Sequence, residues 1–133
     1  MVQKEQNIKL NKVESLEQVR GFMSYYAEYR KECFDIDTFE DENGLFATKS
    51  IKEEKRLHIE EMWVKPELRN KKIGQEYQSK IFKYAKENGY ERVSCAVNLY
   101  NKHANETLAK FLNNNWKLGW TNGDYIGLIK EVV

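Results

Sequence analysis

The chain has 133 residues, and its 22 lysines and arginines nearly balance 21 aspartates and glutamates, giving a formal net charge of +1. This length predicts a single domain spanning residues 1–133. The balanced charge argues against a nucleic-acid-binding protein, because no overall excess of positive charge is available to neutralise phosphates. No apolar run approaches the roughly 20 residues that cross a bilayer, and the N-terminal sequence lacks an apolar signal-peptide core. We therefore expect a cytoplasmic protein that does not bind membranes.

The thiol and imidazole side chains do not predict a metal site. Cys33 and Cys95 each fall on the apolar side of an expected element, which is typical of buried reduced thiols. A disulfide is not expected in a cytoplasmic chain. His58 and His103 have no cysteine or histidine neighbours at ligand spacing, so no metal is expected.

The first third of the chain predicts a strand, a helix and an acidic connection. Residues 6–12 alternate between apolar and polar side chains and predict a short strand. Apolar side chains then recur at three- and four-residue spacing, which predicts a helix from Ser15 to about Cys33. Residues 34–44 contain five acidic side chains and predict a loop or an irregular turn of helix, closed by Asn43-Gly44.

The middle of the chain predicts two strands and a helix. Strands are expected over residues 45–51 and 56–64, joined by the polar turn 52–55, and Pro66 marks the exit from the second strand. A helix begins at residue 73 and ends at the Asn88-Gly89 cap. Its apolar face contains Ile73, Tyr77, Ile81, Tyr84 and Ala85.

The last third predicts a strand, a helix and a hairpin. A strand is expected over residues 92–97, and two more over 116–120 and 125–132 are joined at 121–124, where Asn-Gly is a hairpin signal. A helix is expected from about residue 102 to 114, with Ala104, Leu108, Phe111 and Leu112 on one face. The order β-α-(loop)-β-β-α-β-α-β-β predicts an α/β (α+β) fold in which one mixed, mostly antiparallel sheet is flanked by helices.

The segment between the strand 56–64 and the helix at residue 73 has the composition of an anion-binding turn. It contains Arg69, Lys71 and Lys72, and Gly74 lies at the start of the helix. A helix N-terminus has unpaired N–H groups and a positive dipole end, so it attracts phosphate. The alternative is an ordinary basic turn before a surface helix.

The same segment resembles a known motif. Val64-x-Pro66-x-x-Arg69-x-x-Lys72-x-Gly74 is similar to the acyl-CoA-binding motif V-x-P-x-x-R-x-x-G-x-G/A of the GCN5-related N-acetyltransferase (GNAT) superfamily. Residues 57–64 resemble the family's central strand, which often carries a glutamate four residues before the valine. Downstream, Val97-x-x-x-Asn101-x-x-Ala104 resembles the family's V…N-x-x-A segment, and Asn115-Trp116 stands where the family usually has Gly-Phe. The resemblance implies an acyl-CoA N-acyltransferase-like fold with acetyl-CoA as co-substrate.

The resemblance also implies which residues hold acetyl-CoA. Main-chain N–H groups of the turn would bind the CoA pyrophosphate, the Asn101 side chain would contact the cofactor, and N–H groups at residues 62–64 would polarise the acetyl carbonyl. Lys72 replaces a glycine of the motif, and we expect it to fit with a negative φ and its side chain turned away. The residues assigned in this way are Met62, Trp63, Val64, Arg69, Asn70, Lys71, Lys72, Ile73, Gly74, Gln75 and Asn101.

The implied reaction is direct attack of an acceptor amine on acetyl-CoA, which needs a general base. Glu60 is the candidate, because strand alternation puts it on one face with Met62 and Val64, where partial desolvation would raise its pKa. The alternative is a solvated or salt-bridged carboxylate. His58 is a second candidate on the same face, and its alternative role is structural.

The charge distribution suggests a cationic acceptor. Residues 35–61 hold nine acidic and four basic side chains, and residues 65–92 hold four acidic and eight basic ones. The basic part suits an anionic cofactor and the acidic part a cationic amine, such as a polyamine, an aminoglycoside or a lysine side chain. The alternative is a merely solvated acidic loop. The candidate acceptor-binding residues are Tyr26, Tyr29, Asp35 and Asp37.

One departure from the family leaves a second function open. Members usually have a tyrosine in the last helix that protonates the leaving thiolate, but the two positions that counting indicates are Leu108 and Phe111. Tyr100 or water could substitute, or the chain could be a catalytically impaired module that binds CoA or a protein. Exposed aromatics such as Trp120 would suit a partner surface or a homodimer. Nucleic-acid binding through residues 65–92 is disfavoured because acids are interleaved with the bases.

Overall fold

The computed structural model of the protein describes residues 35–133. The expected strand at 6–12 and the expected helix at 15–33 lie outside these residues. The described chain forms one open, mixed sheet of six strands in the order β1-β2-β3-β4-β6-β5, with two α-helices. The elements are β1 (Asp35–Glu40), β2 (Gly44–Ile51), η2 (Lys52–Glu54), β3 (Arg56–Val64), η3 (Pro66–Leu68), α3 (Ile73–Glu87), β4 (Arg92–Asn98), α4 (Ala104–Asn113), β5 (Lys117–Asn122) and β6 (Tyr125–Glu131).

The chain divides into two compact units. Among the described residues, the first contains residues 35–49 together with Glu61–Lys80, and the second contains Ser50–Glu60 together with Ile81–Val133. The division passes through β3 and α3, which therefore contribute to both units. We describe each unit by itself.

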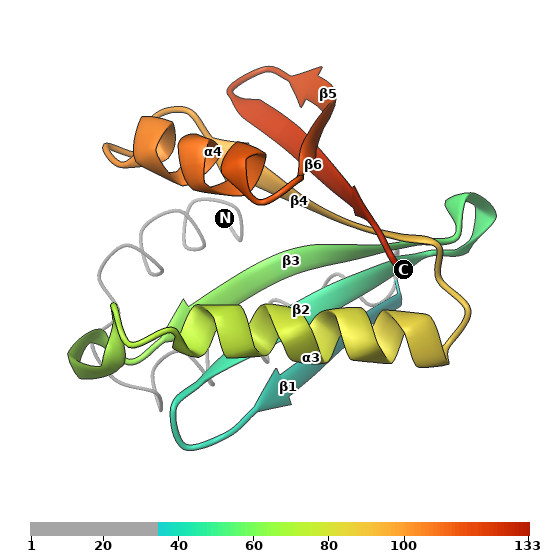
Figure 1. Ribbon diagram of the computed structural model, residues 1–133, viewed down its shortest axis with the longest axis horizontal. Coiled ribbons are helices and arrows are strands. Elements are labelled where there is room, and N and C mark those ends of the chain that lie inside the picture. Colours follow the sequence, from blue (N-terminus) through green and yellow to red (C-terminus); the bar gives the residue numbers. More distant parts are fainter. Residues whose placement is uncertain (1–34) are drawn as a thin grey trace, which may run out of the picture. The chain divides into compact units, whose positions relative to one another are not determined.

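In the first unit, the acidic segment is a strand and not the expected loop. β1 forms a hairpin with β2, and α3 runs across these strands (Figure 1). Phe39 of β1 stacks on Phe46 of β2 with 5.1 Å between ring centroids, and Phe46 contacts Tyr77 of α3 at 5.2 Å. The exposed Asp37 remains in solvent. Packing of Phe39 against the neighbouring strand thus favours a strand where the polar composition predicted a loop.

The strand β3 has the bounds that the sequence predicts. Leu57, Ile59 and Trp63 are buried, whereas the residues between them are half-buried. This alternation confirms that the even-numbered residues from 58 to 64 share the other face of the strand. The helix α3 also begins at the predicted residue, and Tyr77, Ile81 and Ala85 form its buried face.

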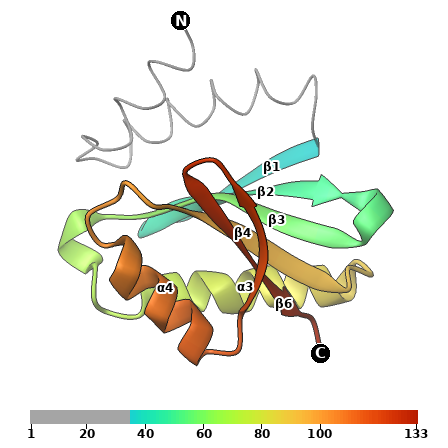
Figure 2. The ribbon, with the colours of Figure 1, turned by 90° about the horizontal axis from the view of Figure 1, so that it is seen from above.

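In the second unit, β4 is the central strand. It pairs with β3 in parallel over three residue pairs, from Arg56↔Arg92 to His58↔Ser94, and with β6 in antiparallel orientation along its whole length. α4 contacts β4 (Figure 2). The buried Trp116 ring is packed edge-on by Phe82 at 5.8 Å and by Phe111 at 5.0 Å, which joins the C-terminal part of α3 to α4.

Two side chains of this unit differ from the sequence interpretation. Leu112 is 46% exposed, although the helical period placed it on the apolar face of α4. Trp120 is half-buried and not exposed, because its ring lies flat against Gly127, where an added Cβ would be 2.1 Å from the indole. The Arg56 guanidinium lies over the same ring, 4.8 Å from the centroid. Trp120 therefore packs within the sheet and offers little free surface to a partner.

Cys95 is a free, buried thiol on β4, as expected. Burial raises its pKa to about 12, so the thiol carries its proton at neutral pH. Cys33 lies outside the described residues. Within residues 35–133, none of the helices has the length and apolar character needed to cross a membrane.

Candidate functional site

The turn that joins β3 to α3, residues 65–72, has a defined and unusual backbone. Its first part is the short η3 helix, in which Leu68 N–H donates to Lys65 O at 2.9 Å. The second part contains two residues in the left-handed region, Asn70 with φ of 65° and Lys72 with φ of 67°. We call residues 65–72 the basic turn.

The conformation of Lys72 contradicts the expectation of a negative φ. The position adopts the left-handed backbone that a glycine would adopt freely, and the lysine keeps it at a cost of about 1–2 kcal/mol. The side chain is exposed, so its charge remains in solvent beside the turn. Residue 72 therefore has a backbone conformation that suits glycine, although the side chain is that of lysine.

The main chain at the start of α3 can accept an anion. The first helical hydrogen bond that spans this end runs from Glu76 N–H to Lys72 O at 3.1 Å. By helix geometry, the N–H groups of residues 73–75 then have no partner within the helix. A Cβ added to Gly74 would meet only Met62 Sδ, at 3.8 Å, so the helix start is uncrowded among the described residues. Exposed Lys71 adds positive charge to that of the helix dipole.

Arg69 shapes the turn from within. Its Nε–H donates to Val64 O at 2.9 Å, and its guanidinium lies over the Trp63 ring, 5.9 Å from the centroid. Trp63 is only 6% exposed, and its Nε1–H has no hydrogen-bond partner among residues 35–133. The arginine thus ties the end of β3 to the far side of η3, which is a structural role the sequence motif did not specify.

The β1–β2 turn contacts the first residue of the basic turn and the helix that follows the turn. Lys65 N–H donates to Asn43 O at 2.9 Å, and Tyr77 O–H of α3 donates to Asp41 Oδ1 at 2.6 Å. The same Asp41 oxygen accepts the N–H groups of Asn43 and Gly44, at 2.8 and 3.2 Å. In the sequence, Asp41 is one of the five acidic side chains of residues 34–44. Its position two residues before Asn43-Gly44, where a side chain can cap a turn, was the available signal.

These contacts shift two pKa values. Desolvation acts to raise the pKa of Asp41, but the hydrogen bonds from Tyr77, Asn43 and Gly44, with the nearby Lys80 charge, outweigh it and hold the pKa below 3.8. For Tyr77, burial and then the hydrogen bond to the Asp41 carboxylate both raise the pKa far above the ordinary value of 10.0. The pair is therefore a neutral phenol donating to an ionised carboxylate at any physiological pH.

Asp41 should make the protein sensitive to acid. Because its folded-state pKa is lowered, its stabilising effect is complete above the unfolded pKa of about 3.9 and is lost as pH falls through the folded value. We expect the free energy of unfolding to fall more steeply below about pH 4 in the wild type than in Asp41→Asn. Urea unfolding from pH 2 to 7 measures this slope, and equal slopes in the two proteins would contradict the assignment.

The strained Lys72 backbone predicts a stabilising substitution. Lys72→Gly removes the left-handed penalty but adds chain entropy to the unfolded state, so we expect a net gain of about 1 kcal/mol in the free energy of unfolding. Lys72→Ala keeps the Cβ and is the control for loss of charge. Urea unfolding midpoints compare the three proteins, and equal stability of the glycine and alanine variants would show that the backbone is not strained.

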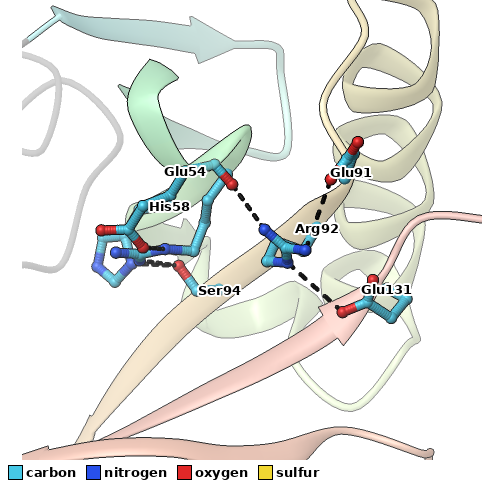
Figure 3. Close-up of polar contacts among 7 residues, drawn as sticks. Glu54, His58, Glu91, Arg92, Ser94 and Glu131 are labelled. Carbon is cyan, nitrogen blue, oxygen red and sulfur yellow. Dashed lines mark hydrogen bonds and ion pairs between the residues drawn. The ribbon is translucent and has the colours of Figure 1, made fainter.

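The polar face of β3 in the second unit contains a compact cluster. Ser94 Oγ lies 2.6 Å from Arg56 Nη1 and 2.8 Å from His58 Nδ1 (Figure 3). Arginine can only donate, so Ser94 Oγ accepts from Arg56 and is able to donate its own proton to His58. His58 is thus held by structural partners. Glu60, two residues along the same face, is half-buried.

Arg92 forms a second group of polar contacts in this unit. It donates to Glu54 O at 2.7 Å and pairs with Glu91 and Glu131, each at 3.6 Å (Figure 3). These contacts join the η2 turn, β4 and the end of β6. All three partners are exposed, so the ion pairs position the strands more than they stabilise them.

The side-chain Nδ2 group of Asn101 can donate a further hydrogen bond. Its Oδ1 accepts His103 N–H at 2.9 Å, and its main-chain O accepts Ala104 N–H at 2.9 Å. The exposed side chain can therefore still donate from Nδ2 to a carbonyl outside the chain. Asn115, where the family usually has glycine, has a φ of 71°, so this position also keeps the glycine conformation.

In α4, neither of the two positions where a family tyrosine was expected has a hydroxyl group. Leu108 is half-buried, and Phe111 packs on Trp116. Tyr100 precedes the helix and is 80% exposed, with its N–H donating to Asn98 Oδ1. Its phenol is therefore free of packing, as a substitute acid would need to be.

The proposed acceptor residues are only partly described. Asp35 begins β1 and Asp37 is exposed on it, whereas Tyr26 and Tyr29 lie outside the described residues. The assigned cofactor residues from Met62 to Gln75 form one continuous segment of the first unit, and Asn101 belongs to the second. The sheet order and the short pairing of β3 with β4 are those of an acyl-CoA N-acyltransferase-like fold.

Comparisons with known proteins identify the family. Residues 8–113 match the acetyltransferase (GNAT) family model, and the chain belongs to this family. The fold is similar to that of the PaiA N-acetyltransferase from Thermoplasma acidophilum in complex with coenzyme A, with a TM-score of 0.63 and 19% identity over 86% of this chain and 72% of that one. No curated protein sequence matches the chain.

Two further structures have the same fold. A GNAT-family acetyltransferase from Elizabethkingia anophelis with acetyl-CoA bound has a TM-score of 0.62 and 13% identity, covering 80% of this chain and 82% of that one. The ribosomal-protein-S18-alanine N-acetyltransferase from Escherichia coli has a TM-score of 0.61 and 10% identity, covering 82% and 76%. At these identities the likeness concerns the fold.

Proposed function

We propose that this protein is an acetyl-CoA-dependent N-acetyltransferase that acts on a primary amine of a cationic small molecule or a lysine side chain. The observation that carries the proposal is the basic turn with the start of α3. Its two left-handed residues and the N–H groups of residues 73–75 form a surface that suits a pyrophosphate, with Lys71 and Lys72 exposed beside it. Structural neighbours crystallised with CoA or acetyl-CoA add support.

Acetyl-CoA would supply the acetyl group as a thioester, and the chain would supply binding and proton transfer. The amine nitrogen forms a bond to the carbonyl carbon as the C–S bond breaks, and the proton lost by the amine passes to the Glu60 carboxylate. Main-chain N–H groups of residues 62–64 would stabilise the developing oxyanion. The Tyr100 hydroxyl or water would return a proton to the CoA thiolate. His58 is less suited as the base, because Ser94 already engages its Nδ1.

A second candidate is a catalytically impaired member that binds CoA or a protein partner. The observation that favours it is the lack of a hydroxyl at Leu108 and Phe111, of which the second is packed against Trp116. CoA thiolate is a good leaving group, so this lack weakens general-acid catalysis without excluding the reaction.

Measuring free CoA with a thiol reagent separates the two candidates. The full chain is incubated with acetyl-CoA and a panel of polyamines, aminoglycosides and lysine peptides, and thermal unfolding is followed with and without acetyl-CoA. Turnover with a cationic amine supports the enzyme. A rise in the unfolding temperature without turnover on any amine would leave only the binding module.

A further inference from the structure

We infer that Tyr77 and Asp41 are positioning residues that hold the basic turn in the shape that binds the CoA pyrophosphate. The inference rests on the proposed function, since it assigns the device that prepares the same turn for its ligand. Neither residue is expected to touch the cofactor.

The backbone of the basic turn needs support from the residues around it. Asn70 and Lys72 both have positive φ without being glycine, and such residues persist where the surrounding structure enforces them. The hydrogen bonds of η3 lie before Asn70, and the bond at the helix start, from Glu76 N–H, reaches the pair only at Lys72 O. The conformation of Asn70 and Lys72 therefore depends on how firmly the residues on either side of them are held.

One group of residues holds both the strand side of the basic turn and the helix that follows it. On the strand side, Lys65 N–H donates to Asn43 O, and the Gly44 Cα packs so closely on Trp63 O that an added Cβ would be 2.1 Å from it. On the helix side, the Tyr77 hydroxyl donates to Asp41 Oδ1. Asp41 and Asn43 lie in the connection between β1 and β2, and Gly44 is the first residue of β2.

Asp41 links the attachment on the strand side of the turn with the attachment on the helix side. One carboxylate oxygen accepts the Asn43 and Gly44 N–H groups and the Tyr77 hydroxyl together, and Lys80 Nζ lies 3.8 Å from the other oxygen. Tyr77 is only 2% exposed and its ring contacts Phe46. The hydroxyl therefore connects α3 to the β1–β2 turn in a fixed position. Its removal would break this connection and leave the Lys65–Asn43 hydrogen bond in place.

The test compares Tyr77→Phe with Tyr90→Phe in the full chain. Tyr90 is a matched control, because its hydroxyl is hydrogen-bonded to Ser50 Oγ in the second unit. We expect Tyr77→Phe to raise the Kd for CoA and the KM for acetyl-CoA by about tenfold while kcat stays near the wild-type value. Tyr90→Phe should leave both constants unchanged. Equal weakening in the two variants, or none in Tyr77→Phe, would overturn the inference.

A double-mutant cycle adds a measurement that a general loss of stability would not reproduce. In a Lys72→Gly background the turn is relaxed, so Tyr77→Phe should weaken CoA binding by a smaller factor than in the wild type. An undiminished factor would contradict the proposed link between the hydroxyl and the strained backbone.

Amide hydrogen exchange tests the inference without any ligand. Exchange at residues 70–76 should be faster in Tyr77→Phe than in the wild type, and unchanged in Tyr90→Phe. If the wild type bound no CoA, the proposed function would fail, while this measurement would still show whether the hydroxyl holds the turn. Unchanged exchange in Tyr77→Phe would refute the positioning role in either case.

Discussion

The Glu60→Gln variant is expected to transfer acetyl groups at least about 100-fold more slowly than the wild type, with little change in the KM for acetyl-CoA. Glutamine has the shape of glutamate but cannot accept the proton that the attacking amine loses. Glu60 is half-buried on the polar face of β3, where a carboxylate can approach a bound amine without full hydration. Steady-state kinetics as a function of pH measure the loss.

The adjacent carboxylate provides the control. Glu61 lies on the opposite face of the strand, so Glu61→Gln should keep the wild-type kcat. The difference in acetyl-transfer rate between Glu60→Gln and the wild type should become smaller as pH approaches about 10, because a primary amine then loses its proton without a base. Turnover by Glu60→Gln that equals the wild type at every pH would show that another group, or solvent, accepts the proton.

Gly44→Ala is expected to lower the free energy of unfolding by about 3 kcal/mol or more. A Cβ at this position would be 2.1 Å from the main-chain O of Trp63 and 3.0 Å from the Cα of Val64. Both are backbone atoms of β3, so no rotation of a side chain can relieve the clash. Because the strand would have to move where it enters the basic turn, binding of CoA should weaken as well.

Gly74→Ala is the matched control, since the added methyl group meets only the flexible Met62 side chain at 3.8 Å. Urea unfolding should place its midpoint near that of the wild type, and its glycine-to-alanine change within a helix is itself favourable. If Gly44→Ala were as stable as Gly74→Ala, the close packing of β2 on the end of β3 would be disproved.

The sequence predicts the central elements well because their burial is one-sided. The alternation from Leu57 to Trp63 and the helical period of Tyr77, Ile81 and Ala85 both reflect a single buried face, so β3 and α3 have the expected starts. β1 has no such face in its sequence. It is held by the Phe39–Phe46 contact and by the turn at Asp41, and neither can be read without knowing that β2 lies beside it.

For the site, the sequence identifies the segment but not its geometry. The motif and the basic residues mark the turn after β3, and the family match confirms the family from which they were interpreted. The sequence could not indicate that Lys72 takes a positive φ, because lysine has no preference for that region and only the surrounding contacts impose it. Tyr77 was assigned to the core by its period, and that period says nothing of where its hydroxyl points.

The buried Cys95 affects how the proposed activity can be assayed. A thiol reagent reacts with thiolates, and a protonated thiol inside β4 offers it neither the reactive form nor access. In a native sample, colour from such a reagent therefore reports released CoA without a contribution from this residue. When β4 unfolds, Cys95 becomes reactive, so the same reagent can time the opening of the sheet.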